Sequence, residues 1–276
     1  MNDIESAVID HYEGSDLLSR ILHGLQAAGT DIEHLQPQDL APVEEFHIGG
    51  RQATEYLVDK LNLCRQDRVL DVGCGIGGAT RYIAARIGSR VTGIDLTPEF
   101  IAAAKTLSHR VGLEESLHFA TGSALAMPFD TAGFDAAVTV HVAMNIRDRA
   151  AFYGEIARVL KPGGRLGIFD VMKKNADELV FPLPWASSPA TSHLLTARDT
   201  EDLLTAAGFA VAEVEDRTAF ALEFFARNQA RQAAEPSPLG PHLMMGDTAR
   251  EKLANVVDNI NNERIVPVQM IAVRAG

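Results

Sequence analysis

The alternation of strand and helix patterns between residues 69 and 172 limits what this chain can fold into more than any other feature. Short apolar runs such as "RVLDVG", "RVTGIDL", "FDAAVTV" and "RLGIFDVM" alternate with amphipathic stretches of helical spacing. One stretch begins with Thr97 as the N-cap and Pro98 at the first helical position, which is typical of a helix start. This alternation predicts an α/β fold: a doubly wound, mostly parallel sheet with helices on both faces.

The segments outside this pattern predict a division of the chain. Residues 1–48 combine two short helical patterns with an acidic, proline-containing stretch, and we expect an N-terminal helical cap. Residues 49–217 form the core, and residues 264–276 return to it as its last strand. Between these parts, residues 218–263 are a long excursion, and connections of this length are usually functional. We therefore expect 218–263 to be a cap insertion that covers the cleft together with 1–48.

Composition excludes several kinds of partner. The net charge of −12 and the lack of a basic stripe argue against a nucleic-acid partner. No apolar run approaches a membrane span, and the acidic N-terminus lacks the features of a signal peptide. Cys64 and Cys74 form neither a disulfide framework nor a metal-binding pair. We expect a cytoplasmic protein without a metal site, either a monomer or a homodimer, that acts on a small molecule.

A glycine-rich loop, "LDVGCGIGG", follows the first predicted strand and opens a helix. Gly73, Gly75 and Gly78 satisfy G-x-G-x-x-G, and Asp95 lies about twenty residues further on. Glycines let a ligand approach the backbone at a helix N-terminus, and a carboxylate at the second strand's end accepts ribose hydroxyls. These features predict a nucleoside site and leave both a nicotinamide dinucleotide and S-adenosylmethionine open.

Asp71 separates these two ligands. It sits at the carboxyl end of the first strand, where the pyrophosphate of a dinucleotide lies. Two like charges a few Å apart there cost several kcal/mol, at an effective dielectric constant of roughly 20. S-adenosylmethionine has no phosphate and carries an ammonium and a sulfonium, so Asp71 favours it. The plainer interpretation is a tight strand–helix turn in which Asp71 caps the helix.

Four motifs, "VLDVGCGIGG", "VTGIDLT", "FDAAVTVHVAMNI" and "LKPGGRLGIFDV", stand in the order and spacing of one known family. Over residues 45–215 the chain resembles the class I S-adenosylmethionine-dependent methyltransferases. Within that class it resembles the small-molecule branch that contains ubiquinone/menaquinone C-methyltransferases and sarcosine/dimethylglycine N-methyltransferases. The resemblance implies a seven-stranded sheet whose last strand is antiparallel and lies next to the edge.

The same resemblance implies roles for individual residues. It places Asp95 at the ribose, Leu96 against the adenine, and a set of loop residues at the methionine end: Asp71, Gly73, Gly75 and Gly77. One position departs from the family, which usually has an acidic residue where this chain has Ser123. The adenine amino group is then accepted more weakly by the Ser123 hydroxyl, or the backbone N–H of Ala124 contacts the ring.

Candidates for the reaction itself come from the carboxyl ends of the strands. His141 directly follows the strand "FDAAVTV", and His47 precedes a Gly-Gly turn. Both are candidate catalytic residues, and His141 is a possible general base. We also expect His141 to bind the cofactor and to set the geometry of cofactor and acceptor more than it transfers a proton. Tyr12 is a weaker candidate. Asp170, at the end of the fifth strand, either touches the substrate or is an exposed acid.

Large apolar residues of the second half are candidates for an acceptor pocket, although aromatic residues at helical spacing more often form ordinary core. They are Trp185, Phe220, Phe224, Phe225, Met244 and Met245. Such residues favour an aromatic or partly apolar acceptor. The sequence thus predicts methyl transfer from S-adenosylmethionine to N, O or C of a small molecule. A NAD(P)-dependent oxidoreductase and a non-catalytic methyltransferase-like binding module are the alternatives.

Overall fold

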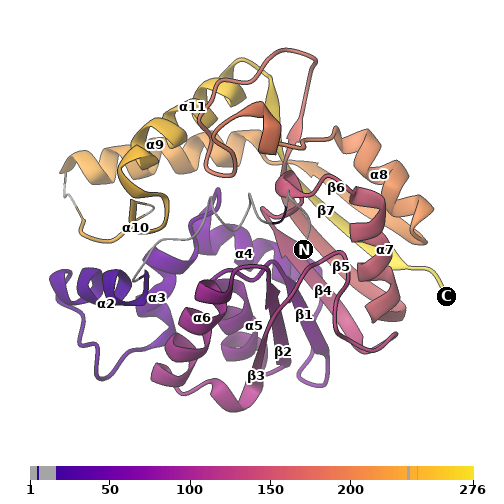
Figure 1. Cartoon of the computed structure of the whole chain (residues 1–276), viewed down its shortest axis with the longest axis horizontal. Helices are drawn as coiled ribbons and strands as arrows, with labels where there is room; N and C mark the ends of the chain where they lie inside the picture. Colours follow the sequence, from indigo (N-terminus) through magenta and orange to yellow (C-terminus); the bar gives the residue numbers. More distant parts are fainter. Residues whose placement is uncertain (1–4, 6–16, 235–236, 241) are drawn as a thin grey trace.

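The computed structural model describes residues 5, 17–234, 237–240 and 242–276. Its centre is a seven-stranded sheet of order β3-β2-β1-β4-β5-β7-β6 (Figure 1). The strands are β1 (Arg68–Val72), β2 (Arg90–Asp95), β3 (Leu117–Thr121), β4 (Phe134–Val140), β5 (Leu160–Lys173), β6 (Phe209–Asp216) and β7 (Ile265–Arg274). Strand β7 runs antiparallel to β5 and β6, while β1 to β5 pair in parallel. The predicted fold class and the antiparallel last strand are both confirmed.

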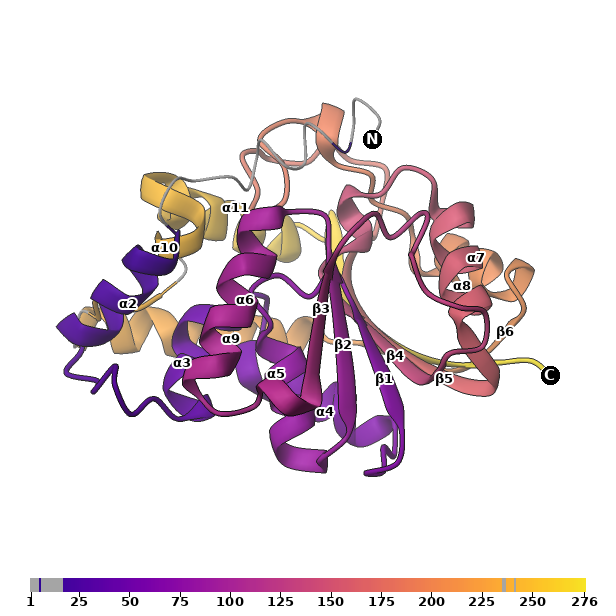
Figure 2. The same ribbon diagram turned by 60° about the horizontal axis from the view of Figure 1, so that its bottom comes forward.

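Helices cover both faces of this sheet (Figure 2). On one face lie α4 (Gly50–Lys60), α5 (Gly78–Ile87) and α6 (Pro98–Arg110), and on the other α7 (Arg149–Val159) and α8 (Ala197–Ala206). Successive side chains of a strand point to opposite faces, so Val69 joins the core under α4 and α5 while Leu70 joins the core under α7. Strands buried on both faces need near-continuous apolar sequence, which explains the unbroken apolar runs.

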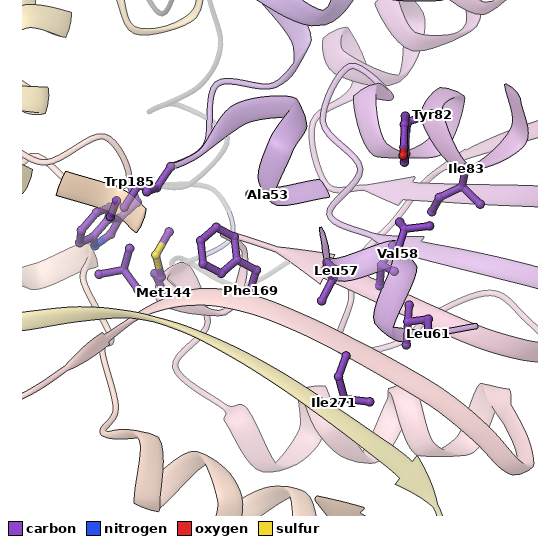
Figure 3. Close-up of a cluster of buried hydrophobic side chains, with 14 of the residues drawn as sticks. Ala53, Leu57, Val58, Leu61, Tyr82, Ile83, Met144, Phe169, Trp185 and Ile271 are labelled. Atoms are coloured by element: carbon purple, nitrogen blue, oxygen red, sulfur yellow. The ribbon is translucent and has the colours of Figure 1, made fainter. Parts of the chain in front are cut away.

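The core under α4 and α5 extends to the carboxyl edge of the sheet (Figure 3). Leu57 of α4 is 1% exposed and packs toward β5 and β7. At the other end of the cluster, Trp185 and Met144 lie together beside Phe169 of β5. The packed interior therefore continues directly into the region above the carboxyl ends of the strands.

Helices from both ends of the chain lie beyond that edge. They are α2 (Leu17–Ala27), α3 (Pro37–Glu44), α9 (Thr218–Ala234), α10 (His242–Met245) and α11 (Ala249–Asn261). Helix α10 packs against α2, although the two are far apart in sequence (Figure 1). The first of the two helices predicted within residues 1–30 lies mostly outside the described residues. Helix α3 was not predicted, because Pro42 inside it obscures a helical pattern.

Candidate active site

A cavity of about 2000 Å³ opens at the carboxyl ends of β1, β2 and β4 and reaches the cap helices. In the sheet order, β1 lies between β2 and β4. After β1 the chain adds β2 and β3 on one side of β1, and it then crosses to the other side of β1 to add β4. Ligands of open α/β sheets bind at such a point. Asp71, Asp95 and His141 all line the cavity, so one site contains residues from three strand ends.

Gly73, Gly75 and Gly77 of the loop differ in the physical reason why glycine is suited to the position. Gly73 has φ of +76°, and a Cβ there would lie 2.3 Å from Val142 Cγ2. Gly75 has φ of +53° and borders the cavity, and a Cβ there would meet nothing within 4 Å. Gly77 has φ of +89° and begins α5, packed against Arg81, and it is not among the described residues that line the cavity. Gly75 is thus the position that leaves room for a ligand.

Asp71 is a buried carboxylate at the wall of this cavity, only 2% exposed. Its Oδ2 accepts a hydrogen bond of 2.6 Å from Thr80 Oγ1 of α5. Burial, with smaller contributions from the carboxylates of Glu45 and Asp95, raises the pKa of Asp71 to about 7. A negative ligand would raise the pKa further, whereas a cation stabilises the ionised form. The site is therefore built for positive charge beside Asp71.

Asp95 ties the end of β2 to the glycine loop. Its Oδ2 accepts from the backbone N–H of Gly75 and its Oδ1 from that of Thr97, each at 2.9 Å. Burial raises the pKa of Asp95. The two backbone contacts fix the orientation of the carboxylate, and each oxygen has a further lone pair for hydroxyl donors.

Two glutamates at the end of α3 add negative charge that the sequence analysis missed. Glu44 accepts from Arg81 and Arg51, with Nη2 to Oε distances of 2.5 and 2.9 Å. Glu45 accepts from Arg51 Nε at 2.5 Å and from Thr54 Oγ1 at 2.5 Å. These bonds join the cap segment to α4 and α5. The signal in the sequence was the pair "EE" before His47, but its arginine partners are assigned only by the fold.

Leu96, Ser123 and Ala124 also line the cavity, on the side of β2 and β3. Ser123 Oγ accepts from the backbone N–H of Leu125 at 3.1 Å and donates to a carboxylate oxygen of Glu5. Glu5 thereby brings a carboxylate to the position where the family usually has one. This contact was not foreseeable, because Glu5 is far from Ser123 in sequence.

His47 and His141 lie side by side, with ring centroids 5.7 Å apart. His141 has φ of +55°, and its ring packs on Phe169 at 5.1 Å. Its Nε2 is buried without a hydrogen-bond partner among the described residues. Burial, with a smaller contribution from His47, holds the pKa of His141 well below its usual range. The structure thus brings the two predicted histidines to one wall of the cavity.

The contacts of His47 define its tautomer. Its Nε2 lies 3.1 Å from the carbonyl oxygen of Gly50, so this nitrogen carries the proton and donates it. Thr54 Oγ1 lies 3.3 Å from the same nitrogen, and this hydroxyl donates to Glu45. Burial lowers the pKa of His47 to about 4. Both rings are therefore neutral at pH 7.

The apolar candidates divide into two groups. Those that line the cavity are Trp185, Phe224, Phe225, Met244 and Met245. Phe220 is not among the described lining residues and packs under the Arg217 guanidinium, 4.5 Å from the ring centroid. Trp185 Nε1 donates to Ser192 Oγ at 3.0 Å, which fixes the indole. The cap side of the cavity thus combines apolar residues with charged ones, which include Arg227, Arg231, Arg250 and Lys252.

Asp170 was expected either to touch the substrate or to be an exposed acid, and both predictions are wrong. It is neither exposed nor among the described residues of the cavity wall: it is 1% exposed, and its Oδ1 accepts from the backbone N–H of Val142 at 2.9 Å. The even-numbered residues of β5 face α7, which takes Asp170 away from the cavity. Burial raises its pKa to about 7. Tyr12 lies outside the described residues.

Residues 5, 17–234, 237–240 and 242–276 contain no group of three or more His, Cys, Asp or Glu side chains arranged to hold a metal ion. No helix in this part of the chain has the length and apolar character that crossing a membrane requires.

Comparison with known proteins shows what the part of the chain that holds this site is similar to. A family model described as "Methyltransferase domain" matches residues 70–168, which hold the glycine loop, Asp95 and His141. This part of the chain therefore matches a methyltransferase domain. The assignment confirms the predicted class, whose methyl donor is S-adenosylmethionine, and no comparison supports the nicotinamide-dependent alternative.

The relatives differ in the extent of the match. The chain is 35% identical to a sterol 24-C-methyltransferase of Eremothecium gossypii over 49% of its own length and 36% of that protein. It is 29% identical to an O-methyltransferase of Penicillium expansum over 74% of its length and 72% of that protein. The chain thus spans about a third of the first relative. A geranyl diphosphate C-methyltransferase from Streptomyces coelicolor has the same fold, with a TM-score of 0.73 and 18% identity over 99% of this chain and 98% of that one.

Proposed function

We propose that the chain transfers the methyl group of S-adenosylmethionine to a nitrogen, oxygen or carbon atom of a small-molecule acceptor. The observation that carries this proposal is the buried Asp71 at the cavity wall. Asp95 lies near enough to Asp71 to raise the pKa of Asp71. Gly75, where a Cβ would meet no atom within 4 Å, borders the same wall. A buried carboxylate without a cation beside it is costly, and an ammonium or sulfonium relieves that cost. A dinucleotide would add phosphate charge to the same wall.

The residues present fit this cofactor. When bound, its sulfonium would supply an activated methyl group for attack by a nucleophile of the acceptor, with the thioether S-adenosylhomocysteine as the leaving group. Asp71 would hold the positive charge of the amino-acid end, and Asp95 the ribose hydroxyls. Leu96 offers an apolar contact for the adenine, where Ser123, its partner Glu5, and the Ala124 backbone offer polar ones. Gly73 also lines the cavity and would lie beside the cofactor, whereas Gly77 would act indirectly, by shaping the loop.

His141 and His47 act by position in this proposal. General bases work best with a pKa near the working pH, and burial has taken both imidazoles far below it. A neutral imidazole still accepts or donates one hydrogen bond per nitrogen. The pair would therefore orient the acceptor beside the methyl group, and alignment alone supplies much of the rate in such a displacement.

The acceptor side belongs to the cap. Residues 1–48 and 218–263 supply α2, α3, α9, α10 and α11, and their aromatic and methionine side chains favour an aromatic or partly apolar acceptor. This division of the chain is part of the proposal, as is a monomer or homodimer. A cytoplasmic location stays a prediction, consistent with Cys64 and Cys74 both being free thiols.

Thermal unfolding with two ligands tests the proposal. S-adenosylhomocysteine at a hundred times its dissociation constant adds about 2.7 kcal/mol to the free energy of unfolding. For a chain of this size we expect the melting temperature to rise by roughly 5 to 10 °C. NAD should leave it unchanged. A shift with NAD and none with the adenosyl ligand would refute the proposal. Labelled S-adenosylmethionine with a panel of amines, phenols and quinols then identifies the acceptor atom.

A further inference from the structure

Helix α11 turns a buried stripe toward the cavity, and one member of this stripe is a lysine. The stripe consists of Ala249, Lys252, Val256, Asn259 and Ile260, and the first three of these line the cavity. Lys252 is only 9% exposed. Figure 1 shows α11 beside α9, above the carboxyl edge of the sheet. The charged group thus sits on the cap side, in the part of the site that we assign to the acceptor.

Lys252 differs from the stripe's other polar member. The Asn259 amide donates to the carbonyl oxygens of Val180 and Asn255, at 3.0 and 2.8 Å, and its Oδ1 accepts from Val180 N–H at 3.0 Å. Asn259 therefore has a structural role that satisfies its polar atoms. Within the described part of the chain, Lys252 Nζ has neither a hydrogen-bond acceptor nor an ion-pair partner.

Other lysines of this acidic chain show what a structural lysine does here. Lys60, Lys161 and Lys174 have side chains that are 35 to 44% exposed, and each holds a carboxylate. Lysines are rarely buried unless they are paired, because desolvating an ammonium is costly. Burial lowers the pKa of Lys252. A largely buried lysine side chain at a cavity wall, with no protein partner for its ammonium among the described residues, therefore lacks the anion that would normally accompany it.

The surroundings narrow the chemistry of that anion. Leu253 and Val257 of the same helix line the cavity, as do Met244, Met245 and Phe224 of the neighbouring helices. Three arginines of α9 and α11 also line it, but all three are exposed, unlike Lys252: Arg227, Arg231 and Arg250. An ammonium in an apolar wall binds an anionic oxygen more strongly than it would in water, because the local dielectric constant is lower. We propose that Lys252 is a specificity residue that binds an anionic oxygen group carried by an otherwise apolar methyl acceptor. This inference rests on the proposed function, since it assigns the acceptor half of the same cavity.

Two fluorescent probes with the same apolar body test this inference. 8-Anilinonaphthalene-1-sulfonate carries an anionic oxygen group, and N-phenyl-1-naphthylamine does not. Each is titrated into protein saturated with S-adenosylhomocysteine. We expect Lys252→Met to lower the affinity for the sulfonate probe by about tenfold or more and to change the affinity for the neutral probe by less than about twofold. Lys252→Arg should bind the sulfonate within a fewfold of wild type. Lys105→Met is the matched control: it makes the same change on an exposed residue of α6 outside the cavity, and should bind both probes as wild type does.

Displacement identifies the anionic group. 1-Naphthoate and 1-naphthyl phosphate should displace the sulfonate probe from wild type at lower concentrations than 1-naphthol. Of these two anions, the one that displaces the probe at the lower concentration identifies the preferred group, carboxylate or phosphate. Equal binding of the sulfonate probe by wild type and Lys252→Met would overturn the inference, as would equal displacement by the neutral naphthol. Calorimetry with S-adenosylhomocysteine is independent of this outcome. Failure of wild type to bind that ligand refutes the proposed function, while the probe comparison in ligand-free protein still decides the role of Lys252.

Discussion

Replacing Asp71 with Asn should stabilise the ligand-free protein and at the same time weaken cofactor binding. The folded pKa of Asp71 is about 7, against an ordinary value of 3.8. This difference of about three units corresponds to roughly 4 kcal/mol. Because the folded pKa is the higher one, the folded state holds the proton longer, and stability falls as pH rises from about 4 to about 7. Asn carries no charge, so Asp71→Asn escapes this loss.

The assay is urea unfolding of both proteins between pH 5.5 and pH 8 without ligand. We expect the stability advantage of Asp71→Asn to grow by about 2 kcal/mol over this range and to level off above pH 7. Calorimetry should show the opposite for the cofactor. Loss of a charged hydrogen-bonding partner costs about 1.5 to 3 kcal/mol, so S-adenosylhomocysteine should bind roughly ten- to a hundredfold more weakly. The wild-type affinity should rise with pH up to about 7, because the ligand's ammonium favours ionised Asp71, and the variant's affinity should not.

Asp170→Asn is the matched control. The pKa of Asp170 is also raised to about 7 by burial, but Asp170 is not among the described residues of the cavity wall. It should gain stability over the same pH range and bind S-adenosylhomocysteine as wild type does. If Asp71→Asn is no more stable than wild type at pH 8, Asp71 is not a desolvated carboxylate. If it binds the cofactor unchanged, the positive charge is held elsewhere and the reasoning fails.

Two further predictions concern binding and catalysis. Asp95→Ala should weaken the binding of S-adenosylhomocysteine by about 1.5 to 3 kcal/mol, measured by calorimetry, while the protein still folds. Unchanged affinity would show that the ribose lies elsewhere. His141→Gln and His47→Gln should each keep much of the methyl-transfer rate, because an amide replaces the imidazole hydrogen bonds, whereas His141→Ala should lose more. With both pKa values lowered, the rate profile between pH 5.5 and 9 should keep its shape in the Gln variants; loss of an acidic limb in His141→Gln would make His141 the base.

The sequence predicted best what depends on local patterns. Apolar periodicity identified the strands, and Thr97, Pro98 and the glycines marked where helices begin. The position of β7 between β5 and β6 came from the resemblance, because nothing local to residues 265–274 defines its neighbours. Residue type and strand end together located Asp71 and Asp95, since parallel strands deliver their carboxyl ends to one edge.

What stayed hidden depends on contacts between distant segments. The Glu44–Arg81 pair, the contact between the rings of His47 and His141, and the hydrogen bond between Ser123 and Glu5 each join residues that no periodicity relates. Asp170 was misjudged because one residue of strand register decides which face it takes. The sequence did not single out Lys252 as a candidate, because a lysine in an amphipathic helix is normally solvated.

The distribution of charge around the cavity links the two proposals. Asp71 and Asp95 at the strand ends and Glu45, which follows α3, bring carboxylates to the cavity. Lys252 of α11 and the exposed Arg227, Arg231 and Arg250 bring positive charge from the side of α9 and α11. A cavity with opposite charges on two walls favours a cationic cofactor on one side and an anionic acceptor on the other, and it disfavours the reverse placement of either. Methyl transfer removes the positive charge of the sulfonium, which weakens the cofactor's attraction to the acidic wall. On this reasoning S-adenosylhomocysteine should bind Asp71→Asn with a smaller relative loss than S-adenosylmethionine, and an equal loss would place Asp71 at the shared ammonium alone.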